Sequence, residues 1–128
     1  MRKTGSITKE IGADPNLDEV KAALFLIEQG LNVKFLKANR TAGSKTPDFL
    51  LNNLRYELKT PRKSGKYTME HAIRAGLRQS NNLVFDLRRM RASEANAVKK
   101  LLKQFDLTKK WKRLLVISKD GKLLTYEK

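Results

Sequence analysis

The stretch FLLNNLRYELK, residues 49–59, decides how this chain folds. Two short runs of alternating apolar residues flank the dipeptide Asn52-Asn53. Asparagine is one of the few residues that adopt the left-handed backbone of a two-residue type I′ turn, so the spacing predicts a β-hairpin. Opposed residue numbers then sum to 105. The predicted pairs are Leu51 with Leu54, Leu50 with Arg55, and Phe49 with Tyr56.

The next pair of the predicted hairpin is chemically unusual, because Asp48 then faces Glu57. Like charges directly opposite each other have Cβ atoms about 4.5–5.5 Å apart and destabilise a sheet. A bridging divalent cation would remove that repulsion, and Mg²⁺ prefers carboxylates together with water and substrate phosphate. Lys59 lies two residues beyond Glu57 on the same face, about 6.5–7 Å along the strand. An ammonium group there would orient a water molecule or neutralise charge on a transferring phosphate.

A simpler interpretation of the same residues stays open. Lys59 would form an ion pair with Glu57 or Asp48 on a solvated sheet face, and such surface pairs contribute little to stability. A Glu-x-Lys sequence alone is a weak signal in a basic protein. The opposed aspartate strengthens the signal, because an ordinary ion pair does not explain two facing carboxylates.

Working outward from the hairpin, hydrophobic periodicity predicts a mixed α/β chain. Residues 1–13 show no clear periodicity and are expected to form a flexible lead-in or linker, with a single domain over residues 14–128. The expected helices cover about 16–29, 67–79 and 93–105, and the expected strands 31–36, 83–87 and 114–117. Asp120-Gly121 predicts a two-residue turn into a last strand at 123–126.

Composition narrows the class of protein. The chain has 128 residues, with 28 Lys and Arg, 13 Asp and Glu, no Cys and one His, and its net charge is +15. The absence of Cys excludes a disulfide scaffold, a Cys-ligated zinc site and a thiol nucleophile. No apolar run reaches the length of a membrane span and no signal peptide is visible. The expected partner of so basic a domain is a polyanion.

The motif Pro47-Asp48 followed by Glu57-Leu58-Lys59 resembles the PD-(D/E)xK nuclease motif. The resemblance implies a restriction-endonuclease-like core with a mixed central sheet flanked by helices. It also implies that Asp48 and Glu57 bind a divalent metal, expected to be Mg²⁺ with Mn²⁺ or Zn²⁺ as alternatives, and that Lys59 positions or activates water. In that family the first helix often adds an acid, here Glu19, and the second helix a polar residue, here Gln79.

More narrowly, four segments are similar to the C-terminal nuclease domains of contact-dependent growth inhibition (CdiA) proteins. They are the run from Asp18-Glu19-Val20-Lys21-Ala22-Ala23 through Gly30, then Thr46-Pro47-Asp48-Phe49, Tyr56-Glu57-Leu58-Lys59, and Gln79 to Leu87. This resemblance implies a toxin that is secreted or delivered from a cell surface and acts in the cytoplasm of a target bacterium. It favours tRNA as the substrate over DNA. It also implies an acidic immunity protein as a partner, and it leaves the oligomeric state open.

Basic residues away from the motif are candidates for contacts with phosphates of the nucleic acid. Arg74 and Arg78 share one helical face, and Arg88 and Arg89 form a dense cluster. Lys110 and Lys112 flank the one tryptophan, Trp111, which is expected in the core more than stacked on a base. Two alternatives to an RNA-cleaving toxin remain: a DNA endonuclease of the same fold, and a basic nucleic-acid-binding domain without catalysis.

Overall fold

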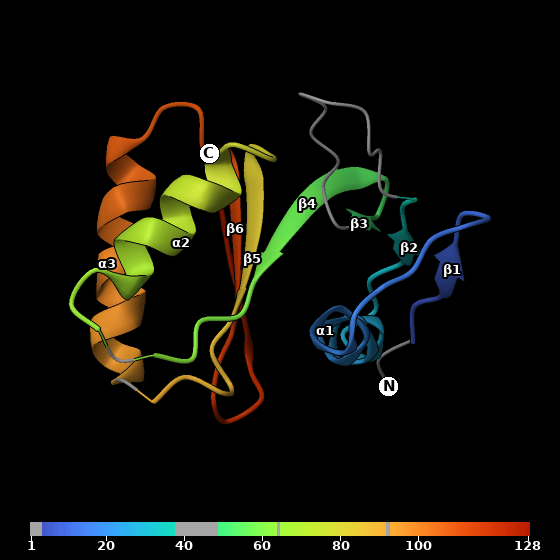
Figure 1. Ribbon diagram of the computed structural model, residues 1–128, viewed down its shortest axis with the longest axis horizontal. Coiled ribbons are helices and arrows are strands. Elements are labelled where there is room, and N and C mark those ends of the chain that lie inside the picture. The colour runs from blue at the N-terminus through green and yellow to red at the C-terminus, as the bar shows by residue number, and fades with distance from the viewer. Residues whose placement is uncertain (1–3, 38–48, 64, 92) are drawn as a thin grey trace. The chain divides into compact units, whose positions relative to one another are not determined.

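The structure is a computed structural model, and it describes residues 4–37, 49–63, 65–91 and 93–128 (Figure 1). The described residues form a mixed α/β fold, as predicted. Its helices are α1 (Leu17–Glu28), α2 (Thr68–Leu77) and α3 (Glu94–Leu107). Its strands are β1 (Ile7–Lys9), β2 (Val33–Phe35), β3 (Phe49–Leu51), β4 (Leu54–Lys59), β5 (Asn82–Asp86), β6 (Arg113–Ile117) and β7 (Leu123–Glu127).

The chain divides into two compact units, residues 1–57 and residues 58–128, and the division falls within β4. In the first unit β1 pairs in parallel with β2, β2 pairs antiparallel with β3, and β3 pairs antiparallel with β4. In the second unit β5 pairs in parallel with β6, and β6 pairs antiparallel with β7. Both units therefore mix parallel and antiparallel pairing. The expected single domain over residues 14–128 stays a prediction.

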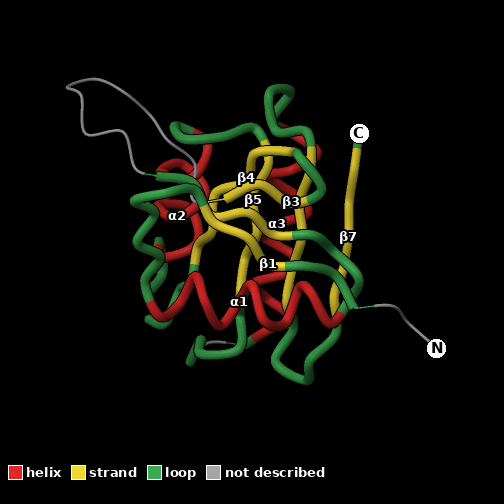
Figure 2. The backbone as a smooth tube through the Cα atoms, turned by 90° about the vertical axis from the view of Figure 1, so that its right-hand side faces the viewer, coloured by secondary structure: helices red, strands yellow, loops and turns green. Residues whose placement is uncertain are grey.

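The two ends of helix α1 are set by capping residues in its sequence. Asn16 accepts a hydrogen bond from the backbone N–H of Glu19, and Gly30 follows the helix with a φ of +91°. An asparagine N-cap satisfies a backbone donor that the helix cannot, and a glycine costs little in the left-handed conformation that stops it. The helix buries Ala22, Ala23 and Leu26. Figure 2 shows it as one uninterrupted helix.

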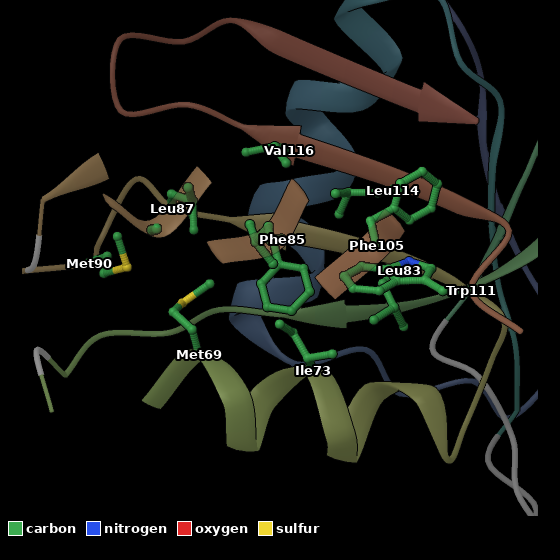
Figure 3. Close-up of a cluster of buried hydrophobic side chains, with 12 residues drawn as sticks. Met69, Ile73, Leu83, Phe85, Leu87, Met90, Phe105, Trp111, Leu114 and Val116 are labelled. Atoms are coloured by element: carbon green, nitrogen blue, oxygen red, sulfur yellow. The ribbon is translucent and has the colours of Figure 1, made fainter. Parts of the chain in front are cut away.

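The second unit has its own hydrophobic core. Helices α2 and α3 lie on the same side of β5 and β6 (Figure 1). Trp111 and Phe105 pack edge to face with ring centroids 5.3 Å apart, and Leu83, Phe85 and other apolar residues surround them (Figure 3). This geometry suits the charge distribution of aromatic rings. Trp111 is fully buried, which confirms its expected place in the core.

Two expectations about local structure were wrong. Residues 7–9, inside the segment expected to be flexible, form β1 because they pair in parallel with Val33 to Phe35. Asp120-Gly121 is not a two-residue turn, because Ile117 pairs with Leu123 and Ser118 exchanges hydrogen bonds with Lys122 and Gly121. The loop is thus a three-residue one, with Gly121 left-handed at a φ of +81° in its last position.

None of the helices that the structure describes is long and apolar enough to cross a membrane.

Candidate active site

The hairpin that presents the candidate site has the predicted register. Phe49 pairs with Tyr56, and Leu51 with Leu54. Asn52 and Asn53 have φ values of +47° and +69°, as a type I′ turn requires. The turn is anchored in the first unit, because Asn52 and Asn32 exchange two hydrogen bonds of 2.9 Å: the amide N–H of Asn52 donates to the carbonyl of Asn32, and the side-chain oxygen of Asn52 accepts from the amide N–H of Asn32.

Glu57 and Lys59 lie on the same strand, β4, two residues apart and so on the same face. Tyr56, Glu57 and Leu58 are all buried, which means that both faces of β4 are covered at this point. Glu57 is 8% exposed, whereas Lys59 is half-buried. A buried carboxylate is costly unless a hydrogen bond, a cation or a metal compensates for it. The burial of Glu57 therefore distinguishes it from a carboxylate on a solvated sheet face.

The predicted pair of Asp48 with Glu57 lies at the border of what the structure describes. Asp48 is outside the described residues, and the observed register reaches Phe49 and Tyr56, one step short of it. Within the described ranges, no three His, Asp or Glu side chains gather closely enough to hold a metal ion. The metal-binding role of Asp48 and Glu57 stays a prediction.

The aliphatic part of Lys59 passes close to a glycine of α2 in the second unit. A Cβ atom added to Gly76 would lie 3.5 Å from Cε of Lys59 and 3.0 Å from Cδ2 of Leu83. Glycine inside a helix costs about 1 kcal/mol relative to alanine. The close approach of Leu83 explains the glycine in α2, whereas 3.5 Å from Lys59 is an ordinary packing distance.

Glu19 has a clear local role at the start of α1. One of its carboxylate oxygens accepts the backbone N–H of Asn16 at 2.8 Å, while Asn16 accepts the backbone N–H of Glu19 at 2.8 Å. This reciprocal arrangement is a capping box, which stabilises a helix N-terminus. Its predicted catalytic role is additional to this one and stays a prediction.

Three candidate residues lie on α2 or directly after it. Arg74 and Arg78 are exposed to solvent. Gln79 is half-buried in the turn that ends the helix, and its backbone N–H donates to the carbonyl of Gly76 at 2.9 Å. The exposure of the two arginines suits contacts with phosphates, and the role of Gln79 stays a prediction.

Arg88 and Arg89 are held by a buried carboxylate that the sequence analysis did not single out. The guanidinium group of Arg88 donates two hydrogen bonds of 2.9 Å to the carboxylate of Asp86, and that of Arg89 donates one of 3.1 Å. The side chain of Asp86 is fully buried, and those of the arginines are about one quarter exposed. Burial raises the pKa of Asp86, but the hydrogen bonds and charge of the arginines outweigh it, so that pKa is lowered overall. Both arginines thus stabilise the end of β5, whatever they also contact.

The basic segment around Trp111 is exposed on either side of the buried ring. Lys110 and Lys112 are exposed, and Nζ of Lys112 donates to the carbonyl of Lys109 at 3.1 Å. The indole N–H of Trp111 donates to the carbonyl of Arg113 at 2.9 Å. Trp111 is therefore satisfied inside the protein, and the two lysines remain the candidates for phosphate contacts.

Comparison of the chain with known proteins identifies the family to which it belongs. Residues 45–123, well over half of the chain, match the family described as the contact-dependent growth inhibition CdiA C-terminal domain. The chain therefore belongs to the CdiA C-terminal toxin domain family. No curated protein matches.

A solved structure has the same fold. A chain of the CdiA-CT/CdiI toxin and immunity complex from Burkholderia pseudomallei aligns with a TM-score of 0.68 and 22% sequence identity. The alignment covers 97% of this chain and 100% of that one.

Proposed function

We propose that this domain is a nuclease toxin that hydrolyses phosphodiester bonds of RNA, with tRNA as the favoured substrate. The observation that carries the proposal is the buried carboxylate of Glu57, two residues from Lys59 on β4, in a chain of net charge +15. The basic charge supplies affinity for phosphates. A buried acid adds nothing to phosphate affinity, whereas a carboxylate is a ligand that a metal ion in hydrolysis can use.

In this proposal Lys59 stabilises the negative charge that develops on the phosphate, or holds the attacking water. Glu57 and Asp48 would hold a divalent cation, for which Mg²⁺ is favoured over Mn²⁺ and Zn²⁺ because carboxylate oxygens are its preferred protein ligands. When bound, such an ion polarises the phosphate and acidifies a bound water. The donor chemistry of Glu57 fits this ion. We further propose that the core is of the PD-(D/E)xK type, which the element order from α1 to β5 supports.

Membership of the CdiA C-terminal domain family supports the toxin assignment. We propose delivery into neighbouring bacteria, with action in the cytoplasm of the target cell. The similar solved structure is a complex of a toxin with an immunity protein, which supports a neutralising partner for this chain as well. A net charge of +15 favours an acidic surface on that partner.

The test is to incubate the purified domain with total tRNA and with plasmid DNA, in Mg²⁺ and in EDTA. We expect cleavage of tRNA in Mg²⁺ and none in EDTA. Glu57→Gln and Lys59→Met should each lower the cleavage rate by about 10²-fold or more, the order of effect seen when a charge-stabilising group is removed from an active site. The matched controls Glu28→Gln and Lys34→Met, both at exposed positions, should cleave at the original rate.

Three outcomes would overturn parts of the proposal. Full activity in folded Glu57→Gln and Lys59→Met would remove the site. Nicked plasmid beside intact tRNA would make the domain a DNA endonuclease. Binding of RNA with no cleavage in Mg²⁺, Mn²⁺ or Zn²⁺ would make it a binding domain without catalysis.

A further inference from the structure

A second basic feature lies wholly within the second unit, and none of its described lining residues belongs to β4. A cavity of about 440 Å³ opens between Lys63 with residues 65–69 on one side and residues 93–103 of the α3 region on the other. This volume is in the range of pockets that hold small ligands. Five lysines line it: Lys63, Lys66, Lys99, Lys100 and Lys103. Among the described residues that line it there is no Asp or Glu.

At least two of the five lysines that line this lysine cavity have partners for their ammonium groups. Nζ of Lys66 lies over the ring of Tyr67, 5.4 Å from its centroid. Nζ of Lys100 lies 3.6 Å from a carboxylate oxygen of Glu70 and 3.3 Å from the carbonyl of Lys66. Lys99 and Lys103 are exposed and lie four residues apart on α3, so they share one face of that helix. Several ammonium groups facing one cavity repel one another, which an anionic ligand would relieve.

The starts of two helices add to the positive potential. Thr68 and Met69, at the start of α2, and Ser93 and Asn96, at the start of α3, all line the cavity. Figure 1 shows both helices beginning toward the lower end of this unit. Helix N-termini favour negative charge through the helix dipole. The backbone N–H groups of Thr68 and Asn96 already donate to the carbonyl of Gly65 and the hydroxyl of Ser93, so the contribution to an anion is the dipole rather than these two donors.

The floor of the cavity is apolar and rich in sulfur. Met69 and Met90 line it, and Figure 3 shows them at one end of the hydrophobic cluster, away from Trp111. A thioether makes favourable contacts with aromatic rings. A nucleotide combines the two matching properties, because its phosphate is anionic and its base is a flat aromatic ring. An acidic peptide would supply the charge without the ring.

We propose that the lysine cavity binds one nucleotide of the RNA substrate, with phosphate oxygens on Lys99 and Lys103 and the base over Met69 and Met90. The inference rests on the proposed function and extends it, because the cavity holds the substrate at a place other than Glu57 and Lys59. Its role is positioning and affinity.

Methyl NMR tests the cavity without any cleavage. The chain has three methionines, Met1, Met69 and Met90, so ¹³C-methyl labelling gives three signals. A short 2′-O-methyl RNA, which resists hydrolysis, should shift the signals of Met69 and Met90 through the ring current of the base and leave that of Met1 unchanged. Inorganic phosphate and polyglutamate, which lack a ring, should leave all three nearly unchanged. Shifts with polyglutamate equal to those with RNA would identify an acidic-protein surface and overturn the proposal.

A binding series gives the second readout. The double variant Lys99→Gln/Lys103→Gln keeps helix propensity and should weaken binding of the same RNA by about tenfold or more. Its plot of log affinity against log salt should also be shallower, by about 0.7 for each lysine that binds a phosphate in the original protein. The control Lys34→Gln/Lys122→Gln removes the same charge at exposed positions outside the cavity and should change affinity much less. An equal decrease in affinity in both double variants would overturn the proposal.

The two proposals fail in different ways. A domain that binds this RNA through Met69 and Met90 but cleaves no nucleic acid would overturn the nuclease and keep the cavity. A domain that cleaves tRNA while both methyl signals stay fixed would overturn the cavity and keep the nuclease.

Discussion

At the scale of single residues, Glu19 has one role that the structure shows and one that is proposed. The capping box requires an acceptor at the third helical position, and glutamine also serves there. Glu19→Gln should therefore keep the free energy of unfolding within about 0.5 kcal/mol of the original, whereas Glu19→Ala should lower it by about 0.5–2 kcal/mol. We expect Glu19→Gln to lower tRNA cleavage at least tenfold, measured beside urea unfolding. Unchanged cleavage by this variant would leave Glu19 as a helix-capping residue alone.

The sequence predicts some site residues better than others. Glu57 and Lys59 share a face because side chains alternate along any strand, so their relation follows from spacing. The partner of Arg88 and Arg89 could not be predicted in this way. Asp86 holds them because the end of β5 is buried, and burial depends on the packing of the whole unit.

At the scale of elements, the hairpin between β3 and β4 is set by its turn. Asn53 has a φ of +69°, a conformation that costs an ordinary residue about 1–2 kcal/mol and asparagine less. Asn53→Ala should therefore lower the free energy of unfolding by about 1 kcal/mol in urea titrations followed by circular dichroism. Asn53→Gly is the matched control and should be at least as stable as the original, because glycine has no Cβ to clash. Equal destabilisation in both variants would mean that the Asn53 side chain, rather than its backbone conformation, stabilises the turn.

The two hairpins show why a turn motif predicts the strand register correctly in one case and wrongly in another. Asn52-Asn53 carries both left-handed residues of a type I′ turn, and the register followed directly. In Asp120-Gly121 only the glycine is left-handed, and Ser118 closes the loop by hydrogen bonds to Gly121 and Lys122. The sequence analysis did not predict strand β1, for another reason. Its pairing is parallel with residues 26 positions away, so three residues without periodicity gave no local signal.

At the scale of the whole molecule, the lysine cavity is a feature that no short sequence motif predicts. Two of its lysines, Lys63 and Lys66, precede α2, and the other three lie on α3, more than 30 residues later; the packing of α2 against α3 brings them together. The net charge predicted a polyanionic partner, but only the fold shows where five of the positive charges meet.

Acid stability is also a property of the whole fold, and Asp86 contributes to it. Its pKa is lowered in the folded protein, so the unfolded chain binds its proton more tightly. The stabilisation is therefore fully present above pH about 4 and is lost as the pH falls further through the folded pKa. Urea unfolding between pH 2 and 7 should show this decrease, and Asp86→Asn should show a shallower one and be less stable at pH 7. An unchanged pH profile in Asp86→Asn would contradict the prediction.

The position of Trp111 makes the protein its own fluorescent reporter. It is the one tryptophan in the chain, it is fully buried, and it belongs to the core of residues 58–128. Its emission therefore follows water entering that unit, whereas far-ultraviolet circular dichroism averages over both units. Coincident curves from the two signals would mean a single cooperative transition, and separated curves would give each unit a stability of its own.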